Sequence, residues 1–135
     1  MKRFIFLCFI VLSACNQNQE KAEQPVEPLY DYDVEERLEE LNITLIPSPP
    51  PVANYVNAVK TGNLIFMAGK GPTKADGGYI TGKVGVDLTI EEGYEAARLT
   101  AINQLGVLKA ELGNLNRVKR IVKTFGMVNS SPEFE

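Results

Sequence analysis

The sequence predicts an α+β fold in which one long helix packs on one face of a β-sheet. Three observations support it: apolar segments at 55–60 and 64–68 flank a turn, apolar residues recur at helical spacing over 90–112, and 118–128 is rich in β-branched residues. A chain of 135 residues accommodates one such domain. The expected order is β-β-β-α-β.

Residues 1–14 have the pattern of a secretory signal, in which Lys2 and Arg3 precede an apolar run that ends in small residues. This run is far shorter than the roughly 20 residues of a membrane-spanning helix. The adjoining Leu-Ser-Ala-Cys resembles the bacterial lipobox, so we expect cleavage before Cys15 and lipidation of that cysteine. Because Cys8 leaves with the signal, the mature domain would have no thiol for a disulfide, a nucleophile or a metal.

Residues 15–30 are expected to form a flexible tether, because this polar, proline-containing segment buries too little apolar surface to offset its ordering entropy. A short helix is expected within 31–42, where Asp33 and Glu36 have the spacing of a capping box. A calcium loop beginning at Asp31 is the rejected alternative, since Glu36 stands where such a loop needs glycine.

Prolines at 47–51 predict an extended stretch before the ordered core. A hairpin is then expected from strands 55–60 and 64–68, joined by a turn at 61–63. Its second strand is apolar without a break, which predicts burial on both faces. A brief third strand is expected at 79–80.

The long helix is predicted from Thr89 and Glu92, which form a second capping box, to a stop at Gly113. Its apolar stripe is expected to face the sheet. The stripe consists of Tyr94, Ala97, Ala101, Leu105, Leu108 and Leu112. The segment 118–128 is expected to return as a strand beside the hairpin.

Composition excludes several function classes. The chain has no histidine, which removes Ser-His-Asp and Cys-His triads and most zinc sites. Its net charge of -3 argues against a general nucleic-acid binder. One basic cluster could bind RNA or an anionic ligand. Alternation along a strand would divide its side chains between two faces, which favours protection of a sheet edge instead. The cluster comprises Arg117, Lys119, Arg120 and Lys123.

Two further patterns are not expected to form a binding or catalytic site. The spacing of Gly77, Gly82 and Lys83 superficially matches a phosphate-binding loop, but Val84 replaces the required Ser or Thr and no helix follows directly. A turn region is the better interpretation. The acidic residues at 91, 92 and 95 complement the positive end of the long helix and are not expected to act as an acid/base pair.

The segments YVNAVKTGNLIFMAGKGP and TGKVGVDLTIEEGYEAARLTAINQLGVLKAELGNLNRVKRIVKTFGMVNSSPEF resemble the Rid family, also called YjgF-like or endoribonuclease L-PSP proteins. The resemblance covers 43–135 and implies a chorismate-mutase-like mixed sheet. It also implies a homotrimer with ligand clefts between subunits, and hydrolysis of imines and enamines such as 2-aminoacrylate without a cofactor. RNA cleavage, reported for some relatives, is not expected here because the charge and the export signal oppose it.

The resemblance assigns Tyr55 to the ligand cleft. It places Ala68, Gly69 and Lys70 at the family's Ser-Gly-Gln position, so a hydroxyl found in many relatives is missing. The arginine that clamps the substrate carboxylate and a water-positioning glutamate would match positions beyond Glu135. We therefore expect a domain incomplete at its C-terminus, with apolar surface left uncovered and no certain catalytic residue in this chain. No metal is expected.

Two functional hypotheses stay open. One is a lipid-anchored protein of imine/enamine hydrolase lineage, inactive as this chain. The other is a non-catalytic trimeric module that captures a small metabolite. Both place the protein in the bacterial cell envelope, and Asn16, instead of the aspartate that retains lipoproteins at the inner membrane, favours the outer membrane.

Overall fold

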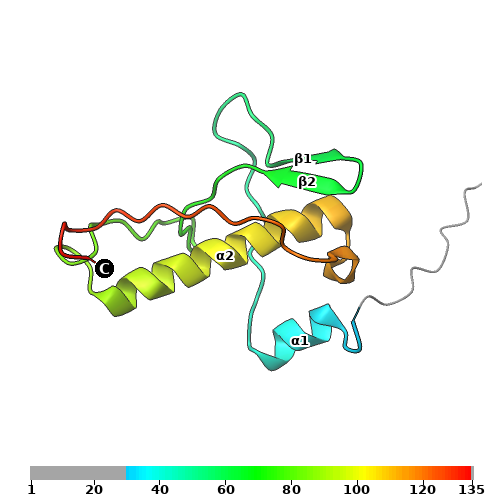
Figure 1. Cartoon of the computed structure of the whole chain (residues 1–135), viewed down its shortest axis with the longest axis horizontal. Coiled ribbons are helices and arrows are strands. Elements are labelled where there is room, and N and C mark those ends of the chain that lie inside the picture. Colours follow the sequence, from blue (N-terminus) through cyan, green and yellow to red (C-terminus); the bar gives the residue numbers. More distant parts are fainter. Residues whose placement is uncertain (1–29, 135) are drawn as a thin grey trace, which may run out of the picture.

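The computed structural model describes residues 30–134, which form a small α+β arrangement around one long helix (Figure 1). The signal, Cys15 and nearly all of the predicted tether lie outside the described residues. No helix in the described part has the length and apolarity needed to cross a membrane. The elements in order are α1 (Val34–Glu40), β1 (Ala58–Thr61), β2 (Leu64–Met67), α2 (Ile90–Leu112) and a 3-10 helix, η1 (Leu115–Arg117).

The predicted hairpin is confirmed as an antiparallel pair of β1 and β2, joined by a tight turn in which Gly62 has a positive φ of 55°. The prediction that the second strand is buried on both faces is wrong. Phe66 is 61% exposed and lies opposite the exposed Val59. The cause is that α2 packs near only one face of this two-stranded sheet, and no described element covers the other.

The long helix begins and ends as predicted. The Thr89 hydroxyl accepts a hydrogen bond from the Glu92 backbone N–H at 3.2 Å, and the Thr89 N–H donates to the Glu92 carboxylate at 2.8 Å. Gly113 ends the helix with φ of 76°, in the left-handed conformation that glycine adopts without a Cβ penalty. Capping chemistry therefore fixes both ends of α2.

The predicted buried stripe of α2 is only partly right. Of its members Leu108 is buried, whereas Tyr94 is 69% exposed and Ala97 and Ala101 are exposed too. The helix instead buries an adjacent face, because the segments at 43–52 and 68–73 pack there. The buried residues of α2 are Ile102, Asn103, Gly106, Val107 and Leu108.

Two predicted strands are absent from the described sheet. At 79–80 there is only an isolated bridge between Thr73 and Tyr79. The segment 118–128 runs back along α2 as extended chain without a paired neighbour (Figure 1). A strand requires a partner for its backbone groups, and no described strand lies beside this segment.

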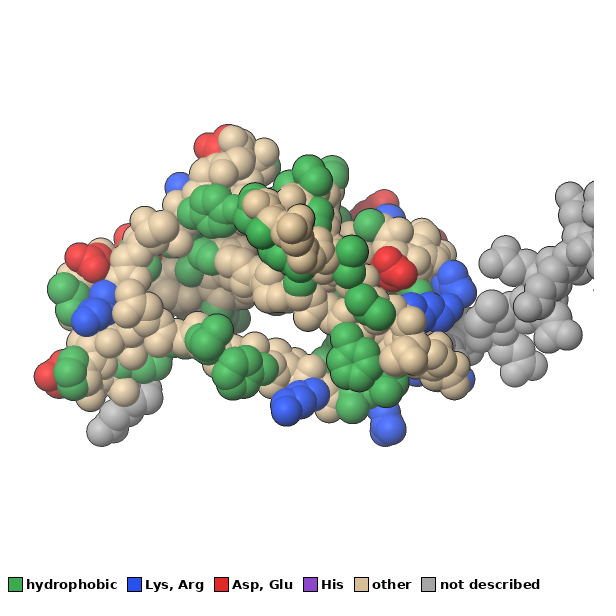
Figure 2. Space-filling model, turned by 90° about the horizontal axis from the view of Figure 1, so that it is seen from above, with side chains coloured by type: hydrophobic (Ala, Val, Ile, Leu, Met, Phe, Trp, Pro, Cys, Tyr) green, Lys and Arg blue, Asp and Glu red, His purple; other side chains and the backbone are tan. Residues whose placement is uncertain are grey.

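Exposed apolar residues follow from the unpaired segment and the open face of the hairpin. Phe125 is 78% exposed and Met127 85% exposed. Figure 2 shows hydrophobic side chains scattered over this face of the molecule, with basic side chains at several separate places around its margin. The buried apolar core is correspondingly small and consists of Val84, Ile102, Val107, Leu108 and Leu115.

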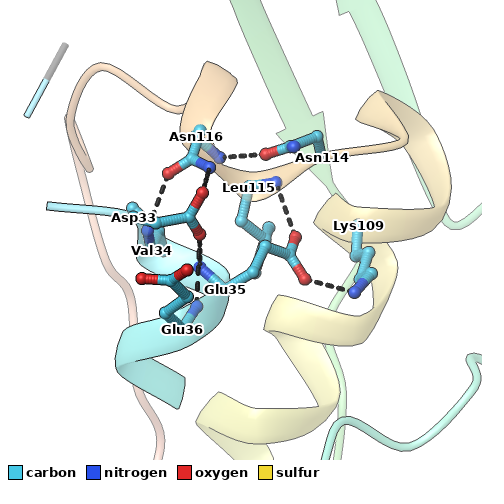
Figure 3. Close-up of polar contacts among 8 residues, drawn as sticks. All are labelled: Asp33, Val34, Glu35, Glu36, Lys109, Asn114, Leu115 and Asn116. Carbon is cyan, nitrogen blue, oxygen red and sulfur yellow. Dashed lines mark hydrogen bonds and ion pairs between the residues drawn. The ribbon is translucent and has the colours of Figure 1, made fainter. Parts of the chain in front are cut away.

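The predicted short helix is confirmed as α1, and its first residues dock on η1 through polar contacts (Figure 3). Asp33 caps the helix by accepting hydrogen bonds from the N–H groups of Glu35 at 2.7 Å and Glu36 at 3.2 Å. The Asn116 side chain donates to Asp33 at 2.9 Å and accepts from the Val34 N–H at 2.7 Å. No α1 residue is fully buried, although Val34 and Leu38 are half-buried, and these polar contacts link α1 to η1.

Glu35 extends this attachment to α2. Its carboxylate pairs with the Lys109 ammonium and accepts a hydrogen bond from the Leu115 N–H at 3.0 Å. The Lys109 hydrogen bond, reinforced by that of Leu115, lowers the pKa of Glu35 below its ordinary 4.5. The pKa of Asp33 is also lowered, chiefly by the Glu36 N–H. Both carboxylates are therefore held in their charged forms.

Candidate functional site

A pocket of about 130 Å³ lies between the proline-rich stretch, the loop after β2 and the middle of α2. This volume is well below the roughly 300–1,000 Å³ of sites for drug-sized ligands, so the pocket suits a small metabolite. Its side-chain walls are mostly proline, aliphatic and tyrosine. The lining comprises Ile46, Pro47, Ser48, Pro49, Pro50, Val52, Tyr55, Gly69, Lys70, Gly71, Thr73, Tyr79 and Asn103.

Two adjacent amide side chains of α2 hold the loop that forms one side of the pocket. Asn103 is buried and donates to the carbonyl oxygens of Gly71 at 3.1 Å and Thr73 at 3.0 Å. Gln104 donates to the carbonyl oxygen of Ala68 at 3.1 Å. A buried amide that satisfies two backbone carbonyls fixes their position, because losing it would leave both unpaired.

Sequence reasoning missed Asn103. The available signal was an amide pair inside an otherwise apolar helical segment, where a polar side chain needs a partner if it is buried.

The proline-rich stretch forms the opposite wall. Its prolines fix φ and keep the backbone extended. Asn57, directly before β1, holds this wall by donating to the Ser48 hydroxyl and the Pro49 carbonyl oxygen, both at 3.1 Å. Ile46 anchors the beginning of the stretch against α2, where its carbonyl oxygen lies over Gly106.

The structure brings together three of the four residues that the resemblance assigned to the cleft. Tyr55, Gly69 and Lys70 line the pocket, and Tyr55 is 45% exposed. Ala68 does not line it, and its carbonyl oxygen is occupied by Gln104. Tyr79 is a further lining residue that sequence reasoning did not single out, and its ring packs near Gly71. The binding role of these residues stays a prediction.

Lys70 is the one charged residue of the lining. Its ammonium donates to the Asn57 side-chain oxygen at 2.6 Å. No carboxylate lines the pocket, and no other titratable side chain does except the two tyrosines. The pocket therefore offers one positive charge and neutral hydrogen-bonding groups, which suits binding better than proton transfer.

Other sequence candidates lie away from the pocket. The glycine-rich segment before Lys83 forms turns, and the Lys83 N–H donates to Asp87 at 2.9 Å. The acidic residues 91, 92 and 95 are exposed on the first turns of α2. Among the described residues no three His, Cys, Asp or Glu side chains gather into a metal-binding group.

Comparison with known proteins gives relatives that share most of this chain. The chain is 42% identical over 97 residues to Protein TCP17 of Trypanosoma cruzi. The matched region covers 72% of this chain and 61% of that protein. No family model matches the chain.

Two solved structures resemble the fold. A protein of unknown function from Agrobacterium tumefaciens, Atu1372, superposes with a TM-score of 0.66 at 41% identity, over 75% of this chain and 62% of that one. A candidate endoribonuclease from Shewanella oneidensis superposes with a TM-score of 0.63 at 31% identity, over 67% of this chain and 60% of the other.

The chain spans about three fifths of the length of these relatives. The structural neighbours are consistent with a Rid-like fold and support a Rid-like lineage.

Proposed function

We propose that this chain is a small-metabolite-binding protein of Rid-like lineage whose ligand lies in the pocket beside Tyr55 and Lys70. The observation that carries the proposal is the composition of the lining, which combines a single cation with neutral hydrogen-bonding and apolar groups. Such a site orients a ligand through a few polar contacts while apolar walls exclude water. It presents no carboxylate or histidine to activate water.

Hydrolysis of an imine or enamine is the second candidate, and the similarity to Rid-like structures favours it. Attack of water on a C=N carbon needs a group that takes a proton and a group that stabilises the developing charge. In the lining only Lys70, Tyr55 and Tyr79 carry a titratable group that could exchange the proton. Because no carboxylate or imidazole lines the pocket, we rank catalysis below binding.

A single experiment separates the two. The purified protein is screened against a panel of small metabolites by thermal denaturation and is then incubated with enzymatically generated 2-aminoacrylate while keto-acid release is followed. Stabilisation by at least one metabolite without faster keto-acid release supports the binding function. Faster keto-acid release would favour the hydrolase if a pocket variant such as Tyr79→Ala abolishes it. An RNA substrate is the third arm of the experiment, and no cleavage of it is expected.

The proposal includes a homotrimer and a lipid anchor on Cys15 at the bacterial outer membrane. The apolar face of the hairpin at Val59 and Phe66 supports assembly, because an exposed apolar patch is typical of an interface. The signal pattern and lipobox supply the argument for the anchor.

A further inference from the structure

The extended segment 118–128, which runs back along α2, has backbone groups that no other described part of the chain pairs with (Figure 1). Between 120 and 128, no backbone N–H or C=O group forms a hydrogen bond to another described residue. The one sheet of the described residues contains only β1 and β2. An unpaired extended edge of this kind is a template to which another strand can add.

Contacts at both ends hold this segment extended. At its start, the Tyr30 hydroxyl donates a hydrogen bond to the Val118 carbonyl oxygen. Just past its end, the Val84 N–H donates to the Asn129 carbonyl oxygen and the Ser131 N–H donates to the Val84 carbonyl oxygen, both at 2.9 Å. Because the segment is already held extended, pairing with a strand costs less conformational entropy than it would for a loose loop.

The segment is basic although the whole chain has a net charge of -3. No Asp or Glu occurs between 112 and 132, and the ion pairs of the described residues include none of the cations there. These exposed cations are Arg117, Lys119, Arg120 and Lys123. Opposite charges attract across paired strands and like charges repel. A second copy of the segment would bring cations against cations, so the charges favour an acidic partner.

Apolar side chains alternate with the cations along the segment. Neighbouring side chains of an extended chain lie on opposite faces. One face therefore carries Lys119, Ile121, Lys123, Phe125 and Met127. The Ile121 side chain is 62% exposed, and those of Phe125 and Met127 are exposed as well. A complementary strand would place acidic side chains opposite the two lysines and aliphatic side chains opposite the apolar residues.

We propose that 118–128 is a docking edge for a segment of another polypeptide, which adds as an antiparallel β-strand and carries acidic and aliphatic side chains in alternation. Main-chain hydrogen bonds would supply affinity, and the alternating side chains would supply specificity. Antiparallel pairing is the more stable arrangement per residue. No residue of this edge lines the pocket, so the proposal goes beyond the proposed function and does not depend on it.

The test uses the end-blocked peptide Val-Thr-Val-Thr-Glu-Thr-Val-Thr-Glu, whose glutamates lie opposite Lys119 and Lys123 in an antiparallel pair. It is titrated into the purified ¹⁵N-labelled protein while amide hydrogen exchange over 119–128 is followed. Exchange is expected to slow by at least about 10-fold at every second amide, because only alternate N–H groups of a strand face one neighbour. Unchanged exchange at saturating peptide overturns the proposal.

Two kinds of control peptide separate charge from main-chain pairing. The same peptide with lysine in place of both glutamates should bind about 10-fold more weakly, because each change replaces an attraction by a repulsion. Equal affinities would overturn the acidic preference. N-methylation of every second residue removes the donors on one side of the peptide, so it should abolish binding in one of the two registers and not in the other. Binding that survives both would overturn strand addition.

Variants of the protein then locate the contact. Lys123→Glu should weaken the glutamate peptide and strengthen the lysine peptide, an exchange of preference that a loss of folding does not produce. Lys74→Glu is the matched control, since Lys74 is an exposed lysine outside the segment, and both peptides should bind it as they bind the parent protein. A preference that also reverses in this control would reduce the effect to net charge and overturn the proposal.

Two further measurements test other occupants of the edge. Protection of 120–128 that increases with protein concentration in the absence of peptide would identify a second copy as the partner. Protection by phosphatidylglycerol vesicles but not by the glutamate peptide would identify a lipid surface. Either result overturns the proposal, and neither bears on the metabolite screen that tests the pocket.

Discussion

The backbone carbonyl oxygen of Ile46 lies directly over the backbone of Gly106, so closely that a Cβ at that position would overlap it. This contact is where the proline-rich wall of the pocket crosses α2. Glycine is required because the oxygen belongs to the backbone and cannot move aside as the end of a flexible side chain could. The contact therefore sets the distance between the wall and the helix that carries Asn103.

Gly106→Ala should destabilise the protein although alanine is the better helix former. The helix propensity gain is about 1 kcal/mol, whereas forcing an extra methyl group into a packed contact typically costs about 1–3 kcal/mol. Thermal denaturation should show a lower Tm, and ligand stabilisation should weaken because the wall is displaced. Gly126→Ala is the control, since no atom lies within 4 Å of its Cβ position; a Gly106→Ala protein as stable as this control would contradict the packing argument.

Glu35→Gln should loosen α1. The substitution removes the ion pair with Lys109 and weakens the hydrogen bond from Leu115, a loss of about 1 kcal/mol for a partly exposed pair. Hydrogen exchange at the Leu115 N–H should accelerate, because that group loses its charged acceptor. Glu111→Gln, an exposed residue of α2, is the control and should leave the exchange rate unchanged.

Acid should weaken the same attachment. The folded pKa values of Glu35 and Asp33 lie below their ordinary values of 4.5 and 3.8, so the unfolded state takes up protons first as the pH falls. Their contribution is complete above about pH 5 and is lost as the pH drops through the lowered folded pKa values. The Tm should fall on acidification, and it should fall less in a variant that carries both Glu35→Gln and Asp33→Asn. An identical acid profile in the two proteins would contradict the assignment.

Local chemistry made much of this fold predictable. The capping box of Thr89 and Glu92, the stop at Gly113 and the turn at Gly62 are each determined by neighbouring residues, and the structure has them where the sequence predicted. The capping of α1 by Asp33 follows the same rule. Boundaries set by short-range hydrogen bonds can therefore be read from the sequence.

Long-range packing was less predictable, because periodicity identifies apolar faces but not what covers them. Helix α2 has apolar residues on two adjacent faces. The segments at 43–52 and 68–73 pack on the face that carries Asn103 and Gly106. The segment 118–128 has strand composition, but its pairing depends on a neighbour. The pocket likewise depends on tertiary contacts, such as that of Asn57 with Ser48, which no local pattern indicates.

Phe66→Ser should weaken the proposed homotrimer. Phe66 and Val59 are paired across the hairpin with both side chains exposed, so an interface there would bury the phenylalanine ring. Without this ring, each subunit loses about 1.5–3 kcal/mol of association free energy from apolar burial. This loss lowers the association constant by more than 10-fold. Light scattering coupled to size exclusion should show the shift to monomer, whereas the exposed turn variant Val86→Ser should stay trimeric. A parent protein that is itself monomeric at high concentration would refute the assembly.

Cys15→Ala should release the protein from the membrane fraction of cells that express the whole chain. The argument is that an acylated Cys15 would supply the anchor, since a signal run of this length is too short to span a bilayer. Metabolic labelling with a radioactive fatty acid should mark the parent protein and not the variant. Cys8→Ala is the matched control because it removes the other cysteine of the chain from within the signal, and it should keep both the label and the membrane association. Labelling that persists in Cys15→Ala but disappears in Cys8→Ala would move the modification to the signal and refute the lipobox assignment.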